Sequence, residues 1–253
     1  MLRLLDQIYR RLATGFALAF IFVGGGVLAV TVLPVVGLFP GDRRERSQRV
    51  IQIIFRFYLD MIQGLNLIRL EIEGRDRLMA CHGKIIVANH PSLLDVVILM
   101  SLVRNAQCII KNELWNHPFL GALMRRAGYI RNDLPAGELV TTCREALDRG
   151  NIIIFPEGTR SVPGIPPRLR RGFANIATLI NADVQLVVIT CTPPMLVKGD
   201  PWWTIPERPS LFRVTAGHCI DSGSYMEYGH RSLASRRLTE NVRAYFTDQL
   251  ANV

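Results

Sequence analysis

Short, almost uninterrupted apolar runs alternate with longer helical patterns through most of this 253-residue chain. The two clearest runs, residues 84–88 and 151–155, are typical of strands that are buried on both faces of a sheet. Helical patterns, such as residues 138–149, lie between such runs. This alternation predicts an α/β fold, in which a largely parallel, mixed sheet is flanked by helices.

The same patterns predict the position of each element. Strands are expected over residues 67–72, 84–88, 107–110, 129–130, 151–155, 184–190 and 212–220. Helices are expected over residues 93–103, 118–127, 138–149, 173–180 and 231–250. Because the first 65 residues lack this alternation, we divide the chain into an N-terminal segment, 1–65, and an α/β domain, 66–253.

The N-terminal segment contains an apolar stretch, residues 12–39, that carries no charged side chain. As one helix, its roughly 28 residues would span about 42 Å, more than the roughly 30 Å of a bilayer's hydrocarbon core. Gly24 to Gly26 and Pro34 can break such a helix. Arginines on its two sides nearly balance, so a single tilted span and a re-entrant segment both remain open. We expect a membrane-embedded helical segment.

A further helix is expected over residues 48–65, where the apolar side chains largely share one side. Arg49 and Arg56 are available in this helix to contact phosphate headgroups. The pattern fits a helix that lies along a membrane surface and equally an ordinary core helix. The sequence leaves both interpretations open.

The formal net charge of the chain is +9 at pH 7, which favours an anionic partner such as nucleic acid, an acidic membrane or a phosphorylated molecule. The basic and aromatic residues do not form the clusters that bind RNA, so we expect no nucleic-acid partner. The five cysteines are odd in number and include no C-x-x-C pair. This argues against a disulfide framework and a zinc site, and we expect no metal ion.

Polar residues and one glycine follow four of the expected strands, and ligand sites in such sheets collect at the carboxyl ends of strands. They are Asn89, His90 and Asp95 after 84–88, Lys111 and Glu113 after 107–110, Arg131 after 129–130, and Glu157, Gly158, Thr159 and Arg160 after 151–155. A histidine can take a proton from a hydroxyl group, while a carboxylate orients its ring and stabilises the imidazolium. Arginine and lysine can neutralise a phosphate. These residue types indicate a site that binds a phosphorylated substrate and deprotonates a hydroxyl group.

The spacing of His90 and Asp95 adds a geometric prediction. Five residues of α-helix turn by about 500°, so the two side chains cannot share one face of a regular helix. We therefore expect His90 to precede the helix that carries Asp95.

Two motifs occur together in this chain: NHPSLLD at residues 89–95 and FPEGTRS at residues 155–161. With KNEL at 111–114 and GYIR at 128–131 between them, they resemble the motif set of the glycerophospholipid acyltransferase family, above all its bacterial 1-acylglycerol-3-phosphate acyltransferases. The resemblance implies that His90 is the general base and Asp95 its partner. It also implies that Glu157, Gly158, Thr159 and Arg160 bind the glycerol phosphate, and that Lys111 and Arg131 contact or position the substrate phosphate.

The resemblance further implies a membrane-bound O-acyltransferase that needs no cofactor. Such an enzyme transfers a fatty acyl group from acyl carrier protein or acyl-CoA to the free hydroxyl of 1-acylglycerol-3-phosphate, giving phosphatidic acid for phospholipid synthesis. Its expected partners are the acyl thioester, the lysophospholipid acceptor and anionic membrane lipids. Its expected location is the bacterial inner membrane, with the acyltransferase domain, 66–253, on the cytoplasmic face.

Three points remain open at the level of sequence. The acceptor could be another lysolipid, such as a lyso-amino-acid lipid or a specialised lipid intermediate. A non-catalytic, membrane-anchored lipid-binding protein would need the cationic residues but not His90. Finally, the basic run of Arg168, Arg170 and Arg171 fits a guide for phosphate groups and equally a solvated loop.

Overall fold

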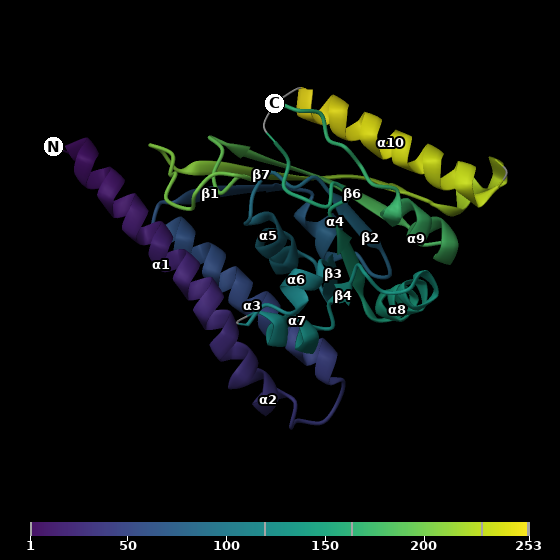
Figure 1. The fold of residues 1–253 in the computed structure, drawn as a ribbon, viewed down its shortest axis with the longest axis horizontal. Helices are drawn as coiled ribbons and strands as arrows, with labels where there is room; N and C mark the ends of the chain where they lie inside the picture. Colours follow the sequence, from purple (N-terminus) through teal and green to yellow (C-terminus); the bar gives the residue numbers. More distant parts are fainter. Residues whose placement is uncertain (1, 119, 163, 229, 252–253) are drawn as a thin grey trace.

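A single mixed sheet forms the centre of the computed structural model, which describes residues 2–118, 120–162, 164–228 and 230–251 (Figure 1). Its strands are β1 (Ile68–Glu73), β2 (Ile85–Ala88), β3 (Ala106–Ile110), β4 (Ile130–Arg131), β5 (Asn151–Ile154), β6 (Val184–Thr192) and β7 (Ser210–Ile220). Within the described residues the strand order is β1–β7–β6–β2–β5–β3–β4. All neighbouring strands are parallel except β6 and β7. The predicted α/β fold is confirmed.

Helices cover both faces of the sheet because successive side chains of its buried strands point in opposite directions. Ile86 and Ala88 of β2 belong to one apolar cluster, and Ile85 and Val87 to another. The first cluster lies under α1 (Leu2–Val30), α3 (Arg43–Gly64), α5 (Asp95–Leu102) and α7 (Gly121–Ala127), and the second under α8 (Ala136–Arg149), α9 (Gly172–Ile180) and α10 (Arg231–Ala251). The short helices are α2 (Val32–Val36), α4 (Arg75–Met79), α6 (Asn112–Trp115) and a 3-10 helix, Gly223–Tyr228.

The register between β2 and β5 brings the two sequence motifs together. The strands are parallel, and Val87 lies opposite Ile154. His90 and Glu157 each follow three residues later, so both reach the same edge of the sheet. A pairing of distant segments therefore builds the site.

Several observed helices differ from the predicted ones; α3, for example, begins at Arg43 rather than at residue 48, and α2 and α4 were not predicted. The helix expected over residues 118–127 begins at Gly121, and Phe119 lies outside the described residues. The sequence pattern did not indicate α6, because a helix of four residues is too short to show a periodic apolar face.

The N-terminal helix is longer than the apolar stretch suggested, since α1 begins at Leu2 and continues through Gly24 to Gly26. The glycines do not break it. A side chain at Gly25 would bring its Cβ within 3.0 Å of Leu120 Cδ2, so this glycine permits close packing against the segment before α7. The helix ends at Val30, and Pro34 lies inside the separate helix α2.

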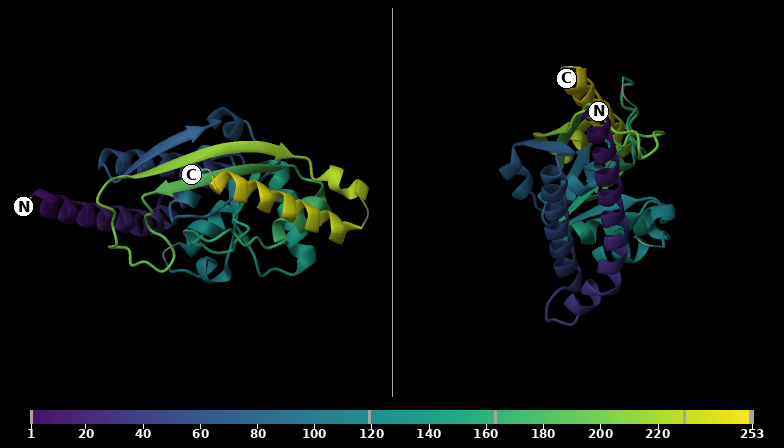
Figure 2. Two further views of the ribbon diagram at one scale, coloured as in Figure 1. Left: turned by 90° about the horizontal axis from the view of Figure 1, so that it is seen from above. Right: turned by 90° about the vertical axis from the view of Figure 1, so that its left-hand side faces the viewer.

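The first turns of α1 are held to the domain by polar contacts. Arg10 is only 6 % exposed; its guanidinium pairs with Asp6 at 2.8 Å and donates a hydrogen bond to the Asn66 carbonyl oxygen at 3.1 Å. The Tyr9 hydroxyl donates to the Leu65 carbonyl oxygen. Beyond these contacts, the N-terminal end of α1 projects past the sheet (Figure 2).

By length and composition, residues Leu4–Val30 could cross a membrane. The same helix also contributes Ala13, Ala17 and Leu28 to the apolar cluster beneath the sheet. The choice between a tilted span and a re-entrant segment, and the domain boundary at 65/66, remain predictions.

Helix α3 presents apolar side chains on two sides. Ile51, Tyr58 and Ile62 are buried in the core, as the amphipathic pattern predicted. Ile53 and Phe57 are 59 % and 58 % exposed. A core face and an exposed apolar face thus occur in the same helix. Both interpretations from the sequence, a core helix and a helix that lies along a membrane surface, therefore remain open.

Candidate active site

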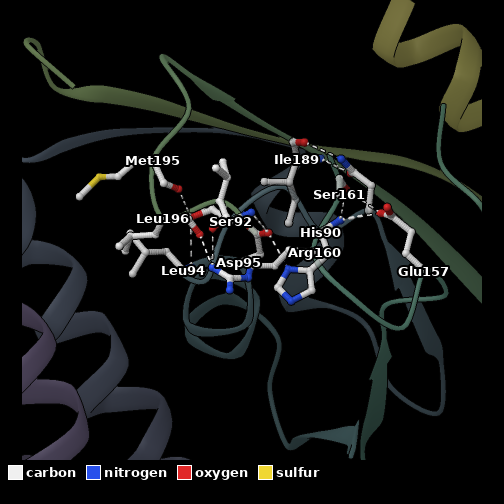
Figure 3. Close-up of polar contacts among 12 residues, drawn as sticks. His90, Ser92, Leu94, Asp95, Glu157, Arg160, Ser161, Ile189, Met195 and Leu196 are labelled. Atoms are coloured by element: carbon white, nitrogen blue, oxygen red, sulfur yellow. Dashed lines mark hydrogen bonds and ion pairs between the residues drawn. The ribbon is translucent and has the colours of Figure 1, made fainter. Parts of the chain in front are cut away.

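His90 and Asp95 lie in contact at the carboxyl end of β2. His90 belongs to the segment between β2 and α5, and Asp95 is the first residue of α5. The His90 Nδ1 and Asp95 Oδ2 atoms are 2.8 Å apart (Figure 3). The prediction that His90 precedes the helix carrying Asp95 is confirmed.

Asp95 is a fully buried carboxylate that is only half satisfied. Its Oδ2 accepts hydrogen bonds from the Ser92 backbone N–H at 2.7 Å and from His90 Nδ1, while Oδ1 has no hydrogen-bond partner within the described part of the chain. Burial raises the pKa of the Asp95 carboxyl to about 6, although His90 and the Ser92 N–H act in the opposite direction. The Asp95 carboxylate therefore lies where it can stabilise an imidazolium that forms at His90 during a reaction.

The contact with Asp95 also defines which nitrogen of His90 can act as a base. An ionised carboxylate only accepts hydrogen bonds, so Nδ1 carries the ring proton and Nε2 retains a lone pair. The ring stacks on Phe155, with 4.2 Å between ring centroids, and its side chain is 15 % exposed. His90 is therefore held on two sides and can accept a proton through Nε2.

Glu157 joins the two motifs through its carboxylate. Its Oε1 accepts from the His90 backbone N–H at 3.0 Å and from the Ser161 hydroxyl at 2.7 Å. The Ser161 N–H in turn donates to the His90 carbonyl oxygen at 2.6 Å. The sequence suggested a substrate ligand at Glu157, and that role remains a prediction; the contacts show a residue that positions the backbone of His90.

Replacing Glu157 with alanine should destabilise this junction. The His90 N–H and the Ser161 hydroxyl would lose a charged acceptor, so we expect the free energy of unfolding to fall by about 1–3 kcal/mol. Urea denaturation of the two proteins measures the difference. Glu157→Gln keeps a carbonyl oxygen at this position and should lose clearly less; equal stability of Glu157→Ala and wild type would contradict the proposed junction.

Beside His90 lies a cavity of about 1030 Å³ with an extensive apolar wall. The wall includes side chains of α1, α3, α5, β3 and α7. Apart from two tyrosines and a cysteine, the polar residues that line the cavity are His90, Lys111, Asn132, Thr159, Arg160 and Arg170. Among the described residues the lining contains three lysine or arginine side chains and no carboxylate. An amphiphilic anion matches this combination of surfaces.

The predicted binding residues are not all at this cavity. Lys111, Gly158, Thr159 and Arg160 line it. The guanidinium of Arg131 is instead paired with the Asp133 carboxylate at 2.7 and 2.9 Å, and Arg131 is absent from the described lining. The roles suggested for all these residues remain predictions, and the structure favours Lys111 over Arg131 as a ligand.

Arg160 lines the cavity and is also hydrogen-bonded to the backbone after β6. Its Nη1 donates to the carbonyl oxygens of Leu196 and Val197, at 2.6 and 3.0 Å. Two hydrogens on that nitrogen are thereby used, and the Nε edge of the guanidinium remains for a ligand. Arg160 therefore ties the segment after β6 to the site.

Three further residues support the site although the motif alone did not assign them roles. Asn89 exchanges hydrogen bonds with the backbone of Ile189, at 2.8 and 2.7 Å, and so joins the ends of β2 and β6. The buried Ser92 hydroxyl donates to the Met195 carbonyl oxygen. Arg170 lines the cavity, which only the folded chain reveals. For Asn89 and Ser92, the signal available in the sequence was their position as polar residues inside NHPSLLD.

The sequence of this chain is similar to those of known acyltransferases. Residues 69–192 match the Acyltransferase family model. A 1-acyl-sn-glycerol-3-phosphate acyltransferase of Pseudomonas aeruginosa is 27 % identical over 236 residues, covering 90 % of this chain and 85 % of that protein. The enzyme of that name from Helicobacter pylori is 39 % identical over 116 residues, covering 42 % of this chain and 48 % of that protein.

Other relatives match over a smaller share of their length. A chloroplast 1-acyl-sn-glycerol-3-phosphate acyltransferase of Brassica napus is 29 % identical over 184 residues, covering 68 % of this chain and 51 % of that protein. The chain spans about half the length of several of the curated relatives it matches.

A solved structure has the same fold. The crystal structure of the 1-acyl-sn-glycerophosphate acyltransferase of Thermotoga maritima superposes with a TM-score of 0.68, covering 96 % of this chain and 97 % of that one at 22 % identity. The segment that matches the family model, residues 69–192, contains both motifs and the His90–Asp95 pair. By the family-model match, residues 69–192 form an Acyltransferase domain, and the motifs and relatives of the chain are similar to those of the 1-acyl-sn-glycerol-3-phosphate acyltransferases.

Proposed function

We propose that this protein transfers a fatty acyl group from a thioester to the free hydroxyl of 1-acylglycerol-3-phosphate, producing phosphatidic acid. The observation that carries the proposal is the His90–Asp95 pair beside a cavity with an apolar wall and three cationic side chains. The apolar wall suits acyl chains, and the cations suit a phosphate. The names of the relatives point to the same acceptor.

In this reaction His90 acts as a general base. Its Nε2 takes the proton of the acceptor hydroxyl as that oxygen attacks the thioester carbonyl carbon. The tetrahedral intermediate collapses, the carbon–sulfur bond breaks, and the leaving thiolate takes the proton from the imidazolium. Asp95 holds Nδ1–H and stabilises the imidazolium throughout. No covalent bond to the protein forms.

The donor is a thioester of acyl carrier protein or of CoA, and the apolar helix α1 is consistent with membrane association. Anionic lipids then lie near the basic chain, whose formal net charge is +9. A bacterial inner membrane, with residues 66–253 on its cytoplasmic face, supplies both the lipid acceptor and the donor.

The test uses the full chain in lipid vesicles, with 1-acylglycerol-3-phosphate and a labelled acyl group on either acyl carrier protein or CoA. We expect labelled phosphatidic acid with at least one donor. Vesicles without the protein provide the background. Label that enters only a different lysolipid would overturn the acceptor, and binding without turnover on any lysolipid would favour a lipid-binding protein.

A further inference from the structure

Arg170 lies on the long connection between β5 and α9, nine residues after the end of the FPEGTRS motif. Its backbone N–H donates to the Pro156 carbonyl oxygen at 2.8 Å, which ties the residue to the turn that follows β5. Its side chain lies against Gly158: a Cβ on that glycine would be 3.0 Å from Arg170 Nε and 3.3 Å from Cζ. The guanidinium is thus held across the turn, at the cavity wall.

No carboxylate in the described part of the chain pairs with Arg170. Within the described ranges, neither Arg170 nor Lys111 forms an ion pair, whereas Arg131 is neutralised by Asp133. One guanidinium nitrogen of Arg160 donates hydrogen bonds to two backbone carbonyl oxygens. Of the three cations at the cavity that His90 lines, Arg170 and Lys111 are therefore the least engaged by the described part of the protein.

The neighbours of Arg170 provide a natural comparison. Arg168 and Arg171 belong to the same basic run and are exposed, but neither lines the cavity. Arg171 lies near enough to α10 to contribute, after Arg236 and Arg243, to lowering the pKa of Glu240. Of the three arginines, the fold directs one to the site.

We propose that Arg170, together with Lys111, recognises the acceptor's phosphate as a monoester and so determines headgroup specificity. This inference rests on the proposed function and deepens it. A phosphate monoester near neutral pH carries between one and two negative charges, whereas a diester carries one. Two unpaired cations favour the monoester, because each can bind separate oxygens of the terminal phosphate.

The experiment compares three acceptors: 1-oleoylglycerol-3-phosphate, its phosphate methyl ester, and 1-oleoylglycerol, which has no phosphate. We expect Arg170→Gln to lower kcat/KM for the monoester by about 10-fold, mainly through KM, because one charge-assisted hydrogen bond is lost at an exposed site. The value for 1-oleoylglycerol should not change. The ratio of monoester to neutral acceptor should therefore fall by the same factor, and the ratio of monoester to methyl ester should fall as well.

Arg171→Gln is the matched control, since it removes the same charge from the adjacent position outside the cavity; its ratio should equal that of wild type. Arg170→Lys should recover part of the preference. An unchanged ratio in Arg170→Gln, or an equal loss on all three acceptors, would overturn the specificity role.

Binding of each acceptor, measured by calorimetry without a thioester, separates the two proposals. If wild type binds the monoester but transfers no acyl group, the proposed function fails, and the ratio of Kd values still tests Arg170. If wild type acylates the monoester and both glutamine variants keep the same Kd ratio, only the inference about Arg170 fails.

Discussion

The His90→Ala protein is expected to acylate 1-acylglycerol-3-phosphate roughly 10²–10⁴-fold more slowly than wild type, because a general base contributes a factor of that size. The loss should appear in kcat, since the cations that line the cavity remain to bind the phosphate. Steady-state rates with saturating donor measure it. The folded state should persist, since the imidazole is partly exposed and its main packing partner is Phe155.

A second histidine provides the control for this experiment. His82 is exposed and lies before β2, at the opposite end of the strand from His90. His82→Ala should retain wild-type turnover and acceptor preference. Turnover by His90→Ala equal to that of His82→Ala would exclude His90 as the base.

Asp95→Asn is expected to lower kcat by about 10- to 100-fold, because it converts a charged hydrogen bond worth about 1.5–3 kcal/mol to a neutral one. An amide oxygen in the place of Oδ2 can still accept from Ser92 N–H and from His90 Nδ1. The His90 tautomer would be kept while the charge that stabilises the imidazolium would be lost. A variant with full activity would contradict the role assigned to Asp95.

The same substitution should change how stability depends on pH. The folded pKa of Asp95 is raised to about 6 from its ordinary 3.8, so the folded wild type binds more protons than the unfolded chain between these values. Wild type therefore loses stability as the pH rises from about 4 to about 6, by up to about 3 kcal/mol. Asparagine carries no charge at any pH. We expect the stability of Asp95→Asn relative to wild type to increase over this window and then stay constant, as measured by urea denaturation at pH 4 to 8.

The buried amide of Asp95→Asn introduces a separate, pH-independent cost. Its NH₂ group would take the place of Oδ1, which has no partner among the described residues. The absolute stability of the variant thus combines two effects, but their pH dependence separates them. Parallel curves for wild type and Asp95→Asn would contradict a raised pKa at Asp95.

The sequence predicted the layers of the fold well because buried parallel strands have a strong local signature. Residues 84–88 and 151–155 are continuous apolar runs, and they form β2 and β5. The order of those strands in the sheet has no such signature. Their adjacency, with Val87 opposite Ile154, follows from packing across the whole domain.

The ends of α1 were harder to predict for a physical reason. The apolar stretch was bounded after Arg11 because charged side chains do not suit a hydrocarbon core, and a break was expected near Gly24 because glycine weakens a helix. In the fold, Arg10 is paired with Asp6 and the Asn66 carbonyl oxygen, and Gly25 allows close contact with Leu120. Tertiary contacts outweigh the local preference at both places.

Within the candidate site, the sequence by itself determined the chemical groups and their local geometry: a histidine five residues before an aspartate, in a segment that cannot be one regular helix. Only the tertiary structure decided how the cations are used. It pairs Arg131 with Asp133, attaches Arg160 to two carbonyl oxygens, and turns Arg170 rather than Arg171 toward the cavity. A positive charge can be read from one residue, but its use depends on the folded conformation: Asp133, two residues away, turns onto Arg131, whereas the partners of Arg160 lie 36 and 37 residues away in the chain.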